Sequence, residues 1–301
     1  MASFPTTSET TTTLASYIPS VWGSKVNEFY KSKLVMADFF TDRSDELANG
    51  GNVLYTPNVG EMSANAKSNA TAVTLNAPTD TKITLTVDQW YEVSFAIEDR
   101  EAAFVQASYT IMERYAKNAG YTIAKKLEVA IATLFSGFSQ TVGASTTALA
   151  DSEIRQAITY LEEANIDTSS ECAFFLSPAV FWKQVQNLDK FSLAINSPSN
   201  DPTAKTPAAY LYGIPVFISN NIQYVAATTG RSNALAHKDA IHFATSALGS
   251  GGSMGTMVGA NGVRVQSNYI PDYLSTVTTA DMLYGVIENR DTSGVWIKTA
   301  A

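Results

Sequence analysis

The chain has few of the residues that usually carry chemistry. Cys172 is the single cysteine among 301 residues, so no intrachain disulfide forms and a reducing compartment is natural. It lies in the apolar run 172–176, where a buried, inert thiol fits better than a nucleophile. No apolar run approaches the length of a membrane span, and the first residues lack the basic-then-apolar pattern of a secretion signal. We therefore expect synthesis in the cytoplasm without export and no membrane partner.

Charged residues are also sparse, at 16% of the chain, and the net charge is -8. Tight binding to nucleic acid needs clustered lysine and arginine, and the sequence has no basic run. Depletion of charge is typical of surfaces that other protein subunits cover, although an ordinary acidic globular protein has a similar composition. An acidic wall would also suit a container that must not adhere to DNA inside it.

Catalytic and metal-binding motifs are weak. Residues 251–255 read Gly-Gly-Ser-Met-Gly, which matches the nucleophile elbow of serine hydrolases. Both histidines, His237 and His242, lie upstream of it, and further glycines follow where that motif needs a helix, so a flexible loop is the better interpretation. On a strand, histidines five residues apart point to opposite faces, and the sequence supplies no further metal ligands. We expect no enzymatic activity, no cofactor and no metal.

The first half of the chain predicts an arm, a ribbon and a long helix. After a Ser- and Thr-rich start, apolar residues at helical spacing indicate a short amphipathic arm ending near 49–51. In residues 52–87, apolar and polar residues alternate as in two β-strands that flank a polar segment. Such a two-stranded ribbon is only marginally stable unless another surface covers it. Residues 98–135 carry the strongest helical pattern, with acidic residues at the start, and predict a strut of about 55 Å.

The second half predicts an α/β arrangement. Asp151 is expected to cap a helix that ends near Asn165, and residues 173–176 form a buried strand. Ser177-Pro178 begins another helix, through Val185. Further strands are expected at 210–218 (a pair), at 234–244, and from 263 to the end, with the last turn at 291–294 and a Gly-rich loop at 248–262.

Two segments carry a family resemblance. Residues 210–219, Tyr-Leu-Tyr-Gly-Ile-Pro-Val-Phe-Ile-Ser, look like the Gly-x-Pro-Val strand pair of tailed-bacteriophage major capsid proteins, and residues 234–244 resemble the strand that follows it. The order of arm, ribbon, long helix and α/β region is also similar to that family, whose architecture is the Hong Kong-type capsid fold. From about residue 20 onward, the chain therefore resembles an α+β capsid subunit.

The resemblance implies a division of the chain and a function. It implies an N-terminal arm (1–51), an extended two-stranded loop (52–87), a peripheral domain with the spine helix (88–149, plus a returning strand near 263–281) and an axial domain (150–262, plus 282–301). The function implied is a coat protein that self-assembles, as pentamers and hexamers, into the icosahedral head around double-stranded DNA. Partners would be copies of itself, DNA contacted non-specifically and a portal. Because the arm is too short to hold a scaffolding segment, a separate scaffolding protein, or none, would guide assembly. Its place would be the virion, assembled in the host cytoplasm.

The arm and the ribbon supply the candidate inter-subunit contacts. These are the apolar residues at the periods described above, with one lysine of the ribbon loop: Trp22, Phe29, Tyr30, Val53, Tyr55, Lys67, Val73, Leu75, Ile83 and Leu85. Some members of the family crosslink a loop lysine to the next subunit, and Lys67 occupies that kind of position, with an ordinary solvated lysine as the alternative.

Three other functions stay open. An encapsulin-like compartment shell would have the same fold but enclose cargo proteins. Another virion component, such as a Thr-rich tail or decoration protein, is disfavoured by the long helix. An enzyme of unknown type has only the serine motif at 251–255 in its favour.

Overall fold

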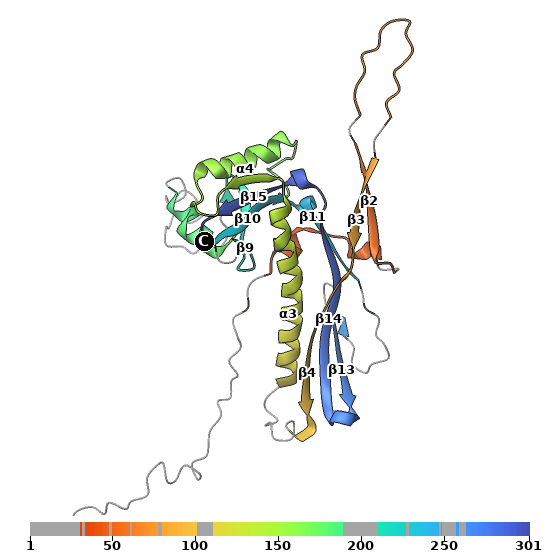
Figure 1. Cartoon of the computed structure of the whole chain (residues 1–301), viewed down its shortest axis with the longest axis vertical. Helices are drawn as coiled ribbons and strands as arrows, with labels where there is room; N and C mark the ends of the chain where they lie inside the picture. Colours follow the sequence, from red (N-terminus) through yellow and green to blue (C-terminus); the bar gives the residue numbers. More distant parts are fainter. Residues whose placement is uncertain are drawn as a thin grey trace, which may run out of the picture.

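The computed structural model describes residues 31, 34–47, 50–60, 62–77, 80–100, 111–188, 210–226, 229–246, 248, 257–258 and 263–301. Figure 1 shows an elongated molecule in which a long helix lies beside long strands, a second sheet sits at one end, and a two-stranded ribbon projects from the body. The arm contacts Trp22, Phe29 and Tyr30 lie outside the described residues, as does the serine motif at 251–255.

One sheet, here called the long sheet, runs along the long helix. Its order is β1-β11-β14-β13-β12, and β4 also pairs with β14. The central strand β14 pairs antiparallel with β4 from Ser275↔Glu98 to Tyr284↔Gln89. The bounds are β1 (Thr41–Asp42), β4 (Gln89–Glu98), β11 (Ile241–Ser246), β12 (Met257–Val258), β13 (Arg264–Ile270) and β14 (Ser275–Glu288).

The long helix α3 (Ile111–Leu134) has a continuous buried stripe. Ala119, Ile123, Leu127 and Ile131 recur every four residues and are buried, as one face of an α-helix requires. They belong to a core that also takes in apolar residues of β11, β14 and α1 (Met36–Phe39). At 1.5 Å per residue the helix is about 36 Å long.

The second sheet, here called the compact sheet, is buried on both faces. Its order is β5-β15-β10-β6-β8-β7, with β9 on β10. Every residue of β6 is buried, which is typical of a strand covered on both sides. One face meets the core around α3, and α4 and α5 cover the other. The bounds are β5 (Gln140–Gly143), α4 (Asp151–Glu163), β6 (Cys172–Leu176), α5 (Pro178–Lys183), β7 (Tyr210–Leu211), β8 (Ile214–Ile218), β9 (Tyr224–Ala226), β10 (Thr229–His237) and β15 (Gly294–Thr299).

Local signals place two elements of the compact sheet where they were predicted. Ser177 caps α5 by accepting a hydrogen bond from the Val180 N–H at 3.3 Å, and Pro178 opens the helix. The strand pair β7–β8 turns at Tyr212 and Gly213, which both have positive φ (51° and 86°), as a tight two-residue hairpin needs.

Three predicted boundaries are wrong. Glu98 does not begin the long helix, because it is the last residue of β4; helical backbone begins at Asp99, and 101–110 lie outside the described residues. The single strand predicted at 234–244 is two strands in different sheets, separated by a 3-10 turn at Lys238–Ala240. Asp151 is inside α4 and not its cap; the Glu153 carboxylate instead accepts a hydrogen bond from the Ala150 N–H at 2.9 Å.

The last strands divide between the sheets. β13 and β14 belong to the long sheet, whereas β15 pairs with β10 and β5 in the compact sheet. The turn at Asp291–Ser293 is therefore a crossing between sheets and not a hairpin. β11 also belongs to the long sheet, although its residues fall within the range 150–262 expected for the axial domain.

Candidate assembly surface

The ribbon is an isolated two-stranded sheet. β2 (Val53–Val59) pairs antiparallel with β3 (Asp80–Thr86) through seven residue pairs, from Val53↔Thr86 to Val59↔Asp80. Figure 1 shows it pointing away from the body, with the chain between the two strands continuing further out. A two-stranded sheet of this kind is marginally stable in water, so it gains most from a surface that covers it.

The outer part of the ribbon, residues 62–77, presents apolar side chains to solvent. All of these residues are exposed, including Met62 (60%), Val73 (67%) and Leu75 (88%). Tyr55 and Val59 on β2 are exposed as well. Apolar side chains exposed on one projecting element make the ribbon a candidate interaction surface.

The tip has an internal polar framework. The Asn65 side-chain amide donates to Asn76 Oδ1 at 2.7 Å, and the Thr71 hydroxyl donates to the Ser68 carbonyl at 2.9 Å. The Lys67 ammonium group donates to the carbonyls of Ser68 (2.8 Å) and Thr71. These bonds are all local, so they shape the tip without attaching it to the body.

The predicted ribbon contacts fall into two groups. Tyr55, Lys67, Val73 and Leu75 are exposed, and Val53 and Ile83 are half-buried. Leu85 is only 2% exposed, and it packs with Leu47 and Val87 at the root of the ribbon. Its side chain serves the core of its own subunit, so Leu85 is removed from the contact set.

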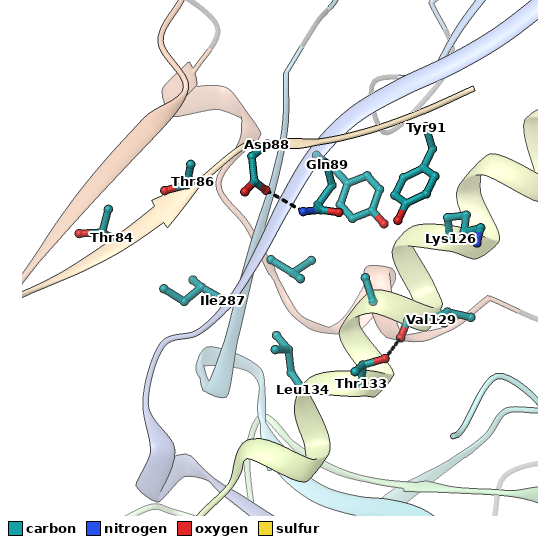
Figure 2. Close-up of a pocket in the computed structure, with 13 residues that line it drawn as sticks. Thr84, Thr86, Asp88, Gln89, Tyr91, Lys126, Val129, Thr133, Leu134 and Ile287 are labelled. Carbon is teal, nitrogen blue, oxygen red and sulfur yellow. Dashed lines mark hydrogen bonds between the residues drawn. The ribbon is translucent and has the colours of Figure 1, made fainter. Parts of the chain in front are cut away.

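A groove separates the root of the ribbon from α3. Figure 2 shows Thr84, Thr86, Asp88 and Gln89 on one side and residues of α3, including Lys126, on the other. The cavity measures about 560 Å³. Tyr91 also lines the groove; its ring stacks on Tyr284 at 5.9 Å between centroids, and the Lys126 ammonium group lies 5.2 Å from the Tyr91 ring centroid.

A buried carboxylate joins α3 to residues 35–37, which fall within the range 1–51 expected for the arm. Glu128 on α3 is fully buried and accepts hydrogen bonds from the backbone N–H groups of Val35 (2.8 Å), Met36 (3.0 Å) and Ala37 (3.2 Å). These are the free N–H groups at the start of α1, where a negative charge is favourable. Burial raises the pKa of Glu128, while the hydrogen bonds act in the opposite direction. Glu128 therefore fixes the point where the chain enters the body.

Comparison with known proteins gives solved structures only. No protein-family model matches the chain, and no curated protein sequence matches it. A chain of Mycobacterium phage Che8 is similar at 19% identity and a TM-score of 0.73, covering 93% of this chain and 97% of that chain. A chain from the capsid structure of the cyanophage P-SCSP1u gives 15% identity and a TM-score of 0.72, with 95% and 94% covered. A chain from the asymmetric unit of the bacteriophage PhiM1 mature capsid gives 13% identity and a TM-score of 0.67, with 94% and 92% covered.

These matches take in almost the full length of both chains, so they concern the complete architecture and not one sheet or helix. The chain has the Hong Kong-type phage capsid fold. The α+β class and the capsid resemblance predicted from the sequence are thereby confirmed. At identities below one fifth, the likeness shows the fold, and function must be argued from this chain's own surface.

The capsid fold joins its two sheets through a small polar junction. Three crossings meet there: 135–139, 238–240 and 288–293. The Asn289 N–H donates to the Ala240 carbonyl at 2.8 Å, and the Ser139 N–H donates to Asp291 Oδ1 at 2.7 Å. The junction therefore depends on hydrogen bonds between segments that no local sequence pattern groups together.

The two histidines lie on neighbouring elements around Asp239, and the cysteine is buried. His237 and His242 belong to different strands, and both lie within 4.0 Å of an Asp239 carboxylate oxygen. In the part of the chain that the structure describes, no three His, Cys, Asp or Glu side chains are grouped so as to hold a metal ion. Burial raises the pKa of the Cys172 thiol to about 12, so the thiolate is scarce at neutral pH.

Glu288 makes the stability of the folded chain depend on pH. Burial and the adjacent Asp291 carboxyl group raise the pKa of Glu288 to about 7, above its ordinary value. Between pH 4.5 and about 7, the folded chain holds a proton on Glu288 that the unfolded chain releases. The free energy of unfolding therefore falls over this range, and the contribution of Glu288 is lost as the pH rises through about 7. Because the group is partly exposed, we expect a loss of only about 1 kcal/mol between pH 5 and 8.

Urea unfolding of wild type and Glu288→Gln at several pH values checks this expectation. The variant should gain stability relative to wild type as the pH rises. In wild type the Glu288 carboxyl group becomes negatively charged, whereas the glutamine side chain stays neutral. Burial lowers the pKa of His242, but that group is common to both proteins and drops out of the difference. Parallel stability curves would contradict the assignment.

In the residues that the structure describes, no helix combines the length and the apolar character needed to cross a membrane.

Proposed function

We propose that this chain is the major capsid protein of a tailed phage, which self-assembles into the icosahedral head around packaged double-stranded DNA. The observation that carries the proposal is the projecting ribbon, whose apolar residues Met62, Val73 and Leu75 are exposed in the single subunit. The fold shared with phage capsid structures supports it. The ribbon gains a surface to cover it when a sister subunit lies beneath it.

The parts of the subunit would then have separate tasks. The long sheet with α3 would form the peripheral domain, and the compact sheet the axial domain near the five- and six-fold axes. A ribbon on a narrow root suits both pentamers and hexamers, because it can adjust to two geometries while the packed cores stay fixed. A net charge of -8 suits non-specific contact with DNA that must later leave.

The remaining partners belong to the same proposal. A separate scaffolding protein and a portal would guide assembly in the host cytoplasm, and the mature protein would reside in the virion without a catalytic role. Lys67 would be a crosslinking residue only if its ammonium group left the local hydrogen bonds with Ser68 and Thr71. Mature particles on a denaturing gel would show a ladder in that case, and a single band otherwise.

Assembly of the purified chain tests the proposal. We expect closed particles with five- and six-fold clusters, detected by sedimentation velocity and negative-stain microscopy, with or without added scaffolding protein. A stable monomer at high concentration, with the ribbon folded onto its own body, would overturn the proposal.

An encapsulin-like compartment is the second candidate, since it would need the same ribbon. The contents of particles from the native source separate the two. Nuclease-protected double-stranded DNA supports the phage head, whereas particles that hold a cargo protein and no DNA support the compartment.

A further inference from the structure

The ribbon leaves the body by crossing directly over the central strand of the long sheet. β4 pairs with β14 as far as Gln89↔Tyr284. The next residue of β14 is Gly285, and the chain passes over it at Thr86 and Val87 before continuing as β3 of the ribbon. Figure 1 shows β3 and β4 on opposite sides of β14.

The crossing leaves no room for a side chain at position 285. A Cβ atom on Gly285 would lie 2.1 Å from the Thr86 carbonyl oxygen, 2.8 Å from the Thr86 carbonyl carbon and 3.0 Å from Val87 Cα. All three are backbone atoms, so no rotamer change relieves the overlap. Glycine is required here for the close approach of two backbones.

The two sides of the crossing differ. On one side, Leu85 and Val87 are buried in a small cluster with Leu47 and Ala244, and the Val87 N–H donates to the Asn52 carbonyl at 2.8 Å. On the other side lies the groove of about 560 Å³ between the root and α3 (Figure 2). The direction of the ribbon is therefore set by the cluster and the crossing, and not by packing against the helix.

We propose that Gly285 is a positioning residue that sets the direction in which the ribbon leaves the subunit. This rests on the proposed function where it concerns shells: the direction decides which part of a sister subunit Val73 and Leu75 reach. At about 3.4 Å per residue, the extended chain from Thr86 to Val73 spans at most about 45 Å. A tilt of about 5° at the root then moves the apolar tip by about 4 Å, enough to misplace a packed contact.

Gly285→Ala tests the proposal, with Gly120→Ala as the matched control. Gly120 lies on α3, and a Cβ there meets nothing within 4 Å. Spin labels on cysteines at two exposed positions, Ala72 in the outer part of the ribbon and Lys125 on α3, report the ribbon direction by pulsed electron paramagnetic resonance of the unassembled subunit. We expect the distance distribution to shift by several ångström in Gly285→Ala and to stay at the wild-type value in Gly120→Ala.

Shell formation gives the second measurement. We expect Gly285→Ala to yield shells of altered diameter or open sheets, and Gly120→Ala to yield wild-type shells. An unchanged distance together with wild-type shells from Gly285→Ala would overturn the proposal. A shifted distance, found while wild type itself forms no shells, would support the positioning role and overturn the proposed function.

Gly285→Ala could fail to fold, so a variant of the anchor provides an independent test. Val87→Ala removes apolar contacts in the root cluster without adding an atom at the crossing. We expect the same label pair to give a broader distance distribution in this variant, because the root is less firmly held. A distribution of wild-type width would count against a root that sets the ribbon's direction.

Discussion

Replacing Val73 and Leu75 together with serine is expected to abolish shell assembly at the concentration that suffices for wild type, and to leave the isolated subunit as stable as wild type. Both side chains are exposed in the single subunit, at 67% and 88%, so their removal takes little from its own core. In an assembled shell they would be covered, and each buried aliphatic side chain contributes about 1.5–3 kcal/mol. A loss of about 3 kcal/mol per ribbon contact raises the concentration needed for assembly roughly hundredfold.

The control for this prediction is Thr74→Ser, which lies between the two residues and is also exposed. It keeps the polarity and length of the tip while removing a single methyl group. Light scattering during assembly, with urea unfolding of the unassembled subunits, separates the effect on contacts from an effect on folding. Shells forming from the double variant at the wild-type concentration would show that the tip is not a contact.

Periodic apolar patterns were enough to predict the ribbon and the body of α3. Two local patterns carry these predictions: the alternation at Val53 and Tyr55, and the four-residue repeat of apolar residues from Ala119 to Ile131. Each pattern lies within the segment whose structure it predicts. Ser177-Pro178 is likewise a local cap signal that the structure confirms. Local rules work here because one face of each element carries its apolar side chains.

The failures arise where distant segments decide the outcome. β4 carries half-buried Val93, Phe95 and Ile97 at every second position, yet its charged end at Glu98 and Asp99 resembled the start of a helix. Its partner β14 is more than 170 residues further along the chain, so nothing local marked the pairing. Residues 234–244 divide between two sheets because β10 pairs with β15 and β11 pairs with β14. Both partners are distant in the sequence, so no local pattern marks the division.

The candidate site shows the same limit. The sequence predicts the exposed apolar side chains at the ribbon tip, because they are isolated among polar residues. The need for glycine at 285 comes from a crossing by residues 86–87, about 200 positions earlier, and the sequence at 285 carries no sign of it. Glu128 adjoins the apolar stripe of α3 and reads locally as a solvent-facing charge, because its three donors come from residues 35–37.

Glu128→Ala is the second change with a large expected effect, here on the stability of the subunit itself. The substitution leaves the N–H groups of Val35, Met36 and Ala37 without their acceptor in a buried site, and each unsatisfied buried group costs about 1–3 kcal/mol. We expect a total loss of about 3–5 kcal/mol in urea unfolding, and faster proteolysis around Val35–Ala37.

Glu128→Gln and Lys125→Ala distinguish this capping role from a general effect on the helix. Glutamine retains one acceptor oxygen but introduces donors that cannot pair with N–H groups, so about half of the loss is expected. Lys125 is exposed on the same helix, and its replacement by alanine should change stability by less than about 0.5 kcal/mol. If Glu128→Ala were as stable as Lys125→Ala, then the removal of a buried charge would outweigh the lost hydrogen bonds, and Glu128 would not be what holds the chain to α3.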